Sequence, residues 1–357
     1  MRRLLPGAAL VGALTLTVTP AHAAPRLIVR VSTGAHGAQL ATASRGGTVS
    51  ADGRYAVYGT LGPADGCSAD FSTCVFVTDL RSGARQQIPG TGTETSGMTI
   101  SADGRRVGYT TGTYHFFKAN VYDRATGGLQ QLWPANPPTD TSYERSDLVG
   151  FSADGRQVSY TIGNRNGSNG VRHLLVRDLS TGTEELIDPV DHPGNVTGGQ
   201  LSADGRFVAY GIQAGSDSAL YVKDRRTGAT TRVDTGAPAG LVQLSADGHR
   251  VLFNALSDGG TWQARVRDLR TGQVRPLGAA TAEAADASLR YVVLAEDTGL
   301  VLLDSRTGAR TTVAPPGSTV VPGSVTRHGR AVVFASTADD LVRDDTNGVS
   351  DVFVHRQ

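Results

Sequence analysis

The chain has 357 residues, of which 39% are hydrophobic and 19% charged, with 34 basic and 33 acidic side chains. The apolar fraction excludes a chain that is disordered throughout, and the net charge of +1 excludes a strong electrostatic attraction to nucleic acid or anionic lipid. Glycine is unusually frequent, with 45 residues in no triplet period, which excludes a collagen and favours many tight turns between short strands.

The N-terminal segment has the pattern of a secretory signal peptide. Arg2 and Arg3 precede an apolar run over residues 4–18, and an Ala-His-Ala sequence ends at Ala23, so we expect residues 1–23 to be cleaved off. A membrane anchor is the alternative, but the run is shorter than the ~20 residues of a spanning helix. We therefore expect residues 24–357 to form a single exported domain, secreted or extracytoplasmic, with no membrane insertion after cleavage.

The chain contains two cysteines, Cys67 and Cys74. An even number of cysteines in an exported chain predicts a disulfide bond. Closing so short a loop would contribute roughly 2–3 kcal/mol if it acts on the entropy of the unfolded chain. A metal site at this pair is the weaker interpretation, because no histidine lies near it in sequence.

An internal repeat dominates the rest of the chain. Copies of Ser-Ala-Asp-Gly-Arg, the fifth ending in histidine, recur at spacings of 51, 51, 50 and 43 residues, beginning at Ser50, Ser101, Ser152, Ser202 and Ser245. Two degenerate copies continue the rhythm at 286–290 and 326–330. An apolar run follows each copy, and a second element, usually Asp-x-x-Thr-Gly, comes later in each unit. Such a period indicates a repeat architecture.

Both elements have the chemistry of hairpin turns. Aspartate bonds the backbone amide two residues on, and glycine takes the left-handed conformation that bulkier residues resist. Each unit therefore predicts four antiparallel strands in about 40–50 residues, the length of a propeller blade. The second strand is apolar on both faces, as in residues 207–210, which favours blades packed between neighbours over a sheet with one wet face. The repeat register also makes residues 279–287 a strand, although their composition favours a helix.

Seven units predict an all-β, seven-bladed propeller. The last unit lacks a fourth strand, because the sequence ends at Gln357 soon after the apolar run 351–355. The apolar segment 26–32 supplies a spare strand near the mature N-terminus. We expect it to form the outer strand of the blade that contains 330–356, since an open ring would leave strand edges unpaired.

Ser-Ala-Asp-Gly-Arg followed by an apolar strand, with Val-x-Asp-x-x-Thr-Gly further on, resembles the WD40-like (PD40) β-propeller repeat of the TolB-like family. The resemblance covers residues 26–357. TolB itself carries an α/β domain before its propeller, and we expect the propeller alone here. Hydrolase domains that follow such propellers in oligopeptidases are likewise not expected.

Long connections are predicted on one face of the ring and tight turns on the other. The insertions fall at 61–73, 111–118, 133–147, 163–171, 188–197 and 336–350. Loops on a rigid scaffold commonly carry binding sites. The binding candidates are aromatic, basic and amide side chains in the second to fourth units: Tyr114, His115, Phe116, Trp133, Tyr143, Arg145, Arg165, Asn166 and His192. The alternative is that Phe116, Phe117 and Trp133 merely cap the blades.

Signs of chemistry are weaker. The oxygen-rich segment 344–351 offers Asp345, Asn347 and Asp351 as weak metal candidates, but its spacing fits a turn better than a calcium loop. None of the common catalytic motifs is present. We therefore expect no cofactor, and a non-catalytic monomer that binds an unidentified protein or polysaccharide through its loop-rich face. The alternative is a lyase-like propeller enzyme with a metal-assisted site at the channel mouth, using His115, His192 and Arg165.

Overall fold

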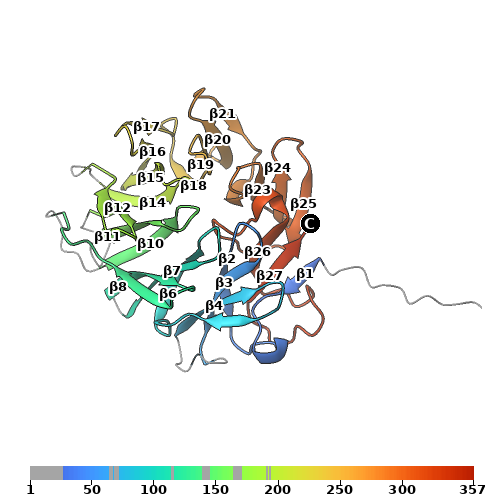
Figure 1. Ribbon diagram of the computed structural model, residues 1–357. Helices are drawn as coiled ribbons and strands as arrows, with labels where there is room; N and C mark the ends of the chain where they lie inside the picture. The colour runs from blue at the N-terminus through green and yellow to red at the C-terminus, as the bar shows by residue number, and fades with distance from the viewer. Residues whose placement is uncertain are drawn as a thin grey trace, which may run out of the picture.

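The computed structural model describes residues 27–63, 67, 72–113, 116–138, 145–163, 171–189, 192 and 194–357. It shows seven antiparallel sheets arranged as blades around a central axis, so the predicted all-β seven-bladed propeller is confirmed (Figure 1). The predicted signal peptide, residues 1–23, lies outside the described residues. Within them, no helix is long and apolar enough to cross a membrane.

Six blades are four-stranded meanders in which neighbours in sequence are neighbours in the sheet. Blades 1 to 3 consist of β2 (Ser44–Val49), β3 (Tyr55–Leu61), β4 (Thr73–Asp79) and β5 (Arg85–Gln87); β6 (Glu94–Ile100), β7 (Arg106–Thr113), β8 (Phe116–Asp123) and β9 (Gly128–Leu132); and β10 (Arg145–Phe151), β11 (Gln157–Gly163), β12 (His173–Asp178) and β13 (Glu184–Leu186). Blades 4 to 6 consist of β14 (Asn195–Leu201), β15 (Phe207–Ala214), β16 (Asp217–Asp224) and β17 (Thr230–Arg232); β18 (Ala239–Leu244), β19 (Arg250–Leu256), β20 (Trp262–Asp268) and β21 (Val274–Pro276); and β22 (Thr281–Ala285), β23 (Tyr291–Glu296), β24 (Gly299–Asp304) and β25 (Arg310–Ala314). The strand β22 confirms the prediction for residues 279–287.

Blade 7 joins the two ends of the chain. The sheet order is β1 (Ile28–Arg30), β27 (Asp351–Arg356) and β26 (Ala331–Ser336), and β1 pairs antiparallel with β27. On the inner edge the segment 319–325 adds two isolated bridges to β26. The predicted closure of the ring by residues 26–32 is therefore confirmed for the described part of that segment.

The Ser-Ala-Asp-Gly turns face the axis and hold neighbouring blades together. In the first copy, the Ser50 hydroxyl donates to Asp52 and accepts from the Tyr55 amide, and Gly53 has φ +74°. Backbone hydrogen bonds then run from turn to turn across five blade junctions, from the amides of Ala51, Ala153, Ala203, Ala246 and Arg327 to the carbonyls of Ala102, Ala203, Ala246, Ala287 and Ala51. The repeated turn thus joins the first two strands of its blade and also links neighbouring blades around the ring.

An arginine–aspartate pair links the two turn elements of most blades. The arginine that ends the first turn reaches the aspartate that begins the second, at 2.5–2.9 Å, in the pairs Arg54–Asp79, Arg105–Asp123, Arg156–Asp178, Arg206–Asp224 and Arg290–Asp304. Both tight turns therefore lie on one face of the ring, as predicted, and the other connections lie on the opposite face.

The core lies between the blades, as strands that are apolar on both faces predict. Val208 and Tyr210 of β15 pack in one buried cluster with Leu174 of blade 3, whereas Ala209 packs in another with Phe253 of blade 5. All five side chains are buried. Two single-turn 3-10 helices, Ala35–Gly37 and Arg327–Gly329, complete the described elements.

Candidate functional site

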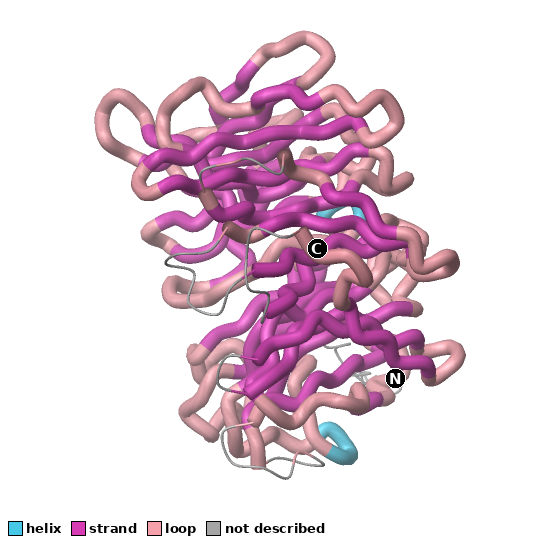
Figure 2. The backbone as a smooth tube through the Cα atoms, turned by 90° about the vertical axis from the view of Figure 1, so that its left-hand side faces the viewer, coloured by secondary structure: helices cyan, strands magenta, loops and turns pink. Residues whose placement is uncertain are grey.

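The loop-rich face carries the connections between the second and third strands and those between blades. Figure 2 views the ring from its side, with strands crossing its thickness and loops at the two faces. One predicted insertion differs from expectation: β7 and β8 extend through most of 111–118, pairing Thr113 with Phe116, so that the described part of this segment is a hairpin.

Four of the nine predicted binding residues are described: Phe116, Trp133, Arg145 and His192. The other five, Tyr114, His115, Tyr143, Arg165 and Asn166, lie outside the described residues. The structure places three of the four on blade 2 and its junction with blade 3, and it places His192 between blades 3 and 4. The predicted set therefore divides into two regions.

The blade 2 region is an aromatic and basic patch. Phe116 is 60% exposed at the start of β8. The Lys118 ammonium lies 3.3 Å from the ring centroid of Trp133, and the Arg145 guanidinium lies 4.4 Å from that of Phe117. These cation–π contacts already occupy Trp133 and Phe117, which leaves Phe116 as the exposed apolar group of the patch.

His192 belongs to a buried cluster that the sequence did not reveal. Its Nε2 lies 3.0 Å from Asp188 Oδ2, and the Nδ1 of His173 lies 2.6 Å from the same oxygen. The other carboxylate oxygen, Oδ1, accepts the Leu174 amide at 2.6 Å. The side chains of Asp188 and His173 are fully buried and that of His192 is 3% exposed. These three residues, the His–Asp–His cluster, bring one carboxylate and two imidazoles within 4.8 Å of one another.

The cluster is positioned by the outer strands of blade 3. His173 is the first residue of β12, and Asp188 follows β13 on the connection to blade 4. Both positions are on the loop-rich face but away from the inner strands that line the axis. The cluster therefore lies between blades, not at the channel mouth.

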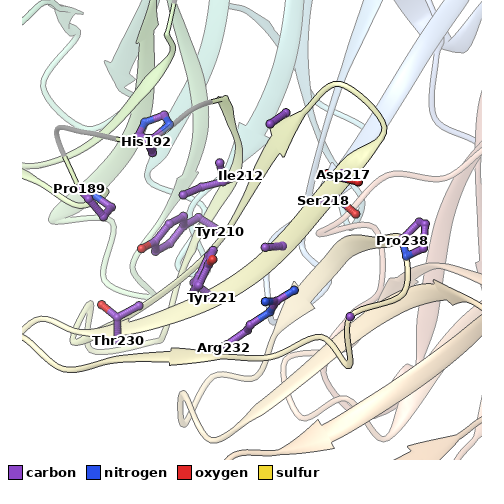
Figure 3. A pocket seen from close by; sticks show the side chains of 13 residues that line it. Pro189, His192, Tyr210, Ile212, Asp217, Ser218, Tyr221, Thr230, Arg232 and Pro238 are labelled. Carbon is purple, nitrogen blue, oxygen red and sulfur yellow. The ribbon is translucent and has the colours of Figure 1, made fainter.

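A cavity of about 700 Å³ adjoins the cluster. Figure 3 shows His192 and Pro189 on the connecting segment, with Tyr210, Ile212, Tyr221 and Arg232 on blade 4. The rings of Tyr210 and Tyr221 stack with centroids 5.6 Å apart. This combination of aromatic walls and a few polar groups is typical of small-molecule sites.

Tyr210, which lines the cavity, carries a neutral hydroxyl. Burial, followed by the negative charge of Asp188, raises the pKa of Tyr210 to about 12. The phenol therefore stays protonated at neutral pH and is a hydrogen-bond donor.

Arg232 stands at the edge of the cavity with 54% of its side chain exposed. Its Nε and Nη2 donate to Asp234, whose side chain is fully buried. The Asp234 carboxylate also accepts the Leu220 amide at 2.7 Å. Arg232 thus neutralises a buried carboxylate and still presents cationic surface to the cavity.

The channel at the tight-turn face has a different character. A cavity of about 230 Å³ there is lined by backbone and small side chains of the repeated turns, such as Ala51, Ala102 and Ala153. Among the described residues that line it, Arg327 is the one ionisable side chain. This lining offers no paired acid and base.

The weak metal candidates of the last blade have other partners. Asp345 and Asp351 lie 3.0 and 3.1 Å from Arg30, and the Asn347 amide donates to Asp351 at 3.0 Å. Ser32 Oγ donates to Asp351 at 2.6 Å. These oxygens tie the N-terminal segment to the last blade.

Sequence reasoning missed His173 and Asp188. The signal available was the separation of four residues between Asp188 and His192, on a connection already singled out. His173 stands 15 residues before Asp188 on a neighbouring strand. Only the register of β12 against β13 brings them together.

No protein-family model and no curated protein matches the chain. Among solved structures it is similar to an oligogalacturonate lyase in complex with manganese, with a TM-score of 0.67 and 14% identity over 92% of each chain. It is also similar to the oligogalacturonate lyase of Vibrio parahaemolyticus (TM-score 0.65, 14% identity, 92% of this chain and 93% of that one). TolB from Acinetobacter baumannii follows, with a TM-score of 0.50 and 15% identity over 75% of this chain and 62% of that one. At these identities the likeness shows the propeller fold.

Proposed function

We propose that this protein is an extracytoplasmic, non-catalytic propeller that binds an acidic carbohydrate chain in the cavity on blade 4. The observation that carries the proposal is the cavity itself, with stacked Tyr210 and Tyr221 as its wall and Arg232 at its edge. Sugar rings present apolar faces that pack on aromatic side chains, and their hydroxyls need a few well-placed polar partners.

The acidic character of the ligand rests on Arg232. Its Nε and Nη2 face Asp234, and its exposed guanidinium edge is available to a second carboxylate. Arginine suits carboxylate recognition because its donors form a planar fork. Tyr210, another residue of the cavity lining, adds a protonated hydroxyl.

The fold likeness supports the same class of ligand. Two of the similar structures are named as oligogalacturonate lyases, and each likeness covers about nine-tenths of both chains. An oligogalacturonate is a polymer of acidic sugars. At 14% identity this supports the choice of probe and assigns no residue.

The test is calorimetric titration with acidic and neutral oligosaccharides chosen from a glycan array. Tyr221→Ala removes a wall of the cavity and is expected to weaken binding at least tenfold. Tyr291→Ala, at a partly buried tyrosine of blade 6, is the matched control and should bind as the wild type does. The double variant Phe116→Ala/Trp133→Ala tests the blade 2 patch: loss of binding there, with Tyr221→Ala unaffected, would move the site away from the cavity.

A second candidate function is a metal-assisted lyase. The specific observation in its favour is that His192, part of the His–Asp–His cluster, also lines the cavity. Incubation of uronate polymers with the protein, with and without added Mn²⁺, tests it through the ultraviolet absorbance of the unsaturated product. Binding without product formation supports the non-catalytic proposal.

The proposal places the mature protein outside the cytoplasm. The predicted disulfide between Cys67 and Cys74 is confirmed, with the Cα atoms 5.7 Å apart, and disulfides persist in oxidising compartments. Mass spectrometry of protein recovered outside the cell tests the location and the cleavage after Ala23 together. A mass that retains the leader would contradict cleavage.

A further inference from the structure

We propose that His173, Asp188 and His192 form a binding site for a divalent transition-metal ion at the junction of blades 3 and 4. The donor atoms are His173 Nδ1, His192 Nε2 and Asp188 Oδ2, and they lie within 4.8 Å of one another. All three side chains are buried, so their orientations are fixed by packing. This inference is independent of the carbohydrate proposal.

The charge of Asp188 is the first argument. A fully buried carboxylate needs a compensating positive charge or it becomes protonated. Within the described part of the chain, no arginine or lysine pairs with Asp188, and its ionic partners are the two imidazoles. A cation bound between the carboxylate and the two imidazoles would supply the compensating charge.

Blade 4 provides an internal comparison. Asp234 occupies the same place in its blade as Asp188 does in blade 3: each accepts the amide of the residue 14 positions earlier, Leu220 or Leu174. In blade 4, Arg232 neutralises this carboxylate. In blade 3 the residue two positions before the aspartate is Leu186, which carries no charge.

The histidines are likewise peculiar to blade 3. By the same alignment, Ala219 stands in blade 4 where His173 stands in blade 3, and Pro238 where His192 stands. Both blades thus have a buried aspartate at this position, but its partner is an arginine in blade 4 and two converging imidazoles in blade 3. The shared turn function of the aspartate explains the carboxylate, but it does not explain the two histidines.

The donor set indicates the class of metal. Two imidazole nitrogens and one carboxylate oxygen suit Zn²⁺ above all, and three protein ligands leave a fourth position open for water or a ligand. His192 lines the cavity, so that position can communicate with it. The oxygen–nitrogen separations of 2.6 and 3.0 Å are shorter than the ~3.3 Å edge of a tetrahedral zinc site. Binding of zinc therefore requires each imidazole to move away from the Asp188 carboxylate by a few tenths of an ångström.

The test uses the full mature protein without a polyhistidine tag, stripped with a chelator and titrated with Zn²⁺ by calorimetry. We expect one ion per chain, a higher melting temperature with Zn²⁺, and a visible band typical of tetrahedral Co²⁺ when Co²⁺ is used instead. His192→Ala and Asp188→Asn should weaken Zn²⁺ binding at least a hundredfold. His36→Ala, an exposed histidine in the N-terminal segment, should not change it.

A second variant guards against loss of fold. His173→Ala combined with Leu186→Arg gives blade 3 two of the three corresponding residues of blade 4 and supplies an arginine counter-ion for Asp188. We expect this variant to fold with a wild-type circular dichroism spectrum and to bind no Zn²⁺. Wild-type protein that takes up no Zn²⁺ at micromolar concentration, or equal binding by Asp188→Asn, would overturn the proposal. Zn²⁺ binding that is lost in His192→Ala while carbohydrate binding survives would separate this site from the proposed function.

Discussion

Replacement of Arg30 by methionine tests how the ring is held closed. Arg30 lies on β1, and its guanidinium faces the carboxylates of Asp345 and Asp351 at 3.0 and 3.1 Å. The side chain of Arg30 is 10% exposed, that of Asp345 is 4% exposed and that of Asp351 is fully buried. Methionine keeps much of the apolar stem, so the change chiefly removes the charge. Removing one partner of a buried ion pair costs about 3–5 kcal/mol.

The lower end of that range applies here. The Arg30 nitrogens are close to the oxygens, yet they make no well-aligned hydrogen bond, so the contact is ionic. Asp351 also keeps hydrogen bonds from Ser32 and Asn347 when Arg30 is lost. We therefore expect Arg30→Met to lower the free energy of unfolding by about 3 kcal/mol at neutral pH.

The loss of stability caused by Arg30→Met should become smaller as the pH falls. Burial raises the pKa of Asp351 above its ordinary value of 3.8, against the opposing effects of Ser32 and Arg30. Loss of Arg30 raises that pKa further. A carboxyl group whose pKa is higher in the folded protein than in the unfolded chain binds more protons when folded, so falling pH favours the folded state. The difference between Arg30→Met and wild type should be largest at neutral pH and shrink as the pH falls toward about 4.

Urea denaturation at several pH values measures the free energy, and hydrogen exchange of β27 reports the closure directly. Arg343→Met, an exposed arginine of the same loop, is the matched control and should stay within about 0.5 kcal/mol of wild type. An Arg30→Met penalty equal to that of the control, or one that grows on acidification, would refute the reasoning.

Three further predictions concern the turns and the disulfide. Gly248 and Gly272 both have φ +73°, but a Cβ at Gly248 would strike a neighbouring aromatic ring whereas one at Gly272 meets nothing within 4 Å. In urea denaturation, Gly248→Ala should therefore destabilise the protein by about 1–3 kcal/mol more than Gly272→Ala does. Equal effects of the two substitutions would contradict this. Replacing Cys67 and Cys74 with serine should cost about 2–3 kcal/mol in non-reducing buffer and nothing under reducing conditions. The Ser180 hydroxyl, followed by the Ser180 and Thr181 amides, lowers the pKa of Asp178 from 3.8 to about 2. The stabilisation that this carboxylate provides is therefore present above about pH 4 and lost as the pH falls toward 2, and Asp178→Asn should flatten the stability profile in that window.

The architecture could be predicted because local turn chemistry and global pattern agree. Each Ser-Ala-Asp-Gly copy requires a left-handed glycine, and the structure shows φ +74° at Gly53. The degenerate copies keep a left-handed residue at the glycine position, with φ +55° at Leu289 and φ +65° at Gly329. In the last copy His328 is left-handed as well, with φ +64°, where the intact copies have aspartate. The closing strand followed from counting strands, since the last unit lacked one and segment 26–32 supplied it.

The candidate site could be predicted only in part. His192 was found because it lies on a long connection, but its partners His173 and Asp188 are set by the pairing of β12 with β13. The cavity walls, Tyr210 and Tyr221, read in sequence as ordinary apolar strand positions. Their role depends on which side of blade 4 they face and on how the connection before it packs, and neither is local information.

The two faces of the ring divide stability from function. On the tight-turn face, the same arginine–aspartate pair recurs in five blades, and turn-to-turn hydrogen bonds cross five junctions. On the loop-rich face, equivalent positions diverge: the buried aspartate after the fourth strand meets Arg232 in blade 4 and two histidines in blade 3. A repeat scaffold held together on one face can change individual side chains on the other without loss of the ring. Differences between blades at equivalent positions of that face are therefore where a specific activity is to be sought.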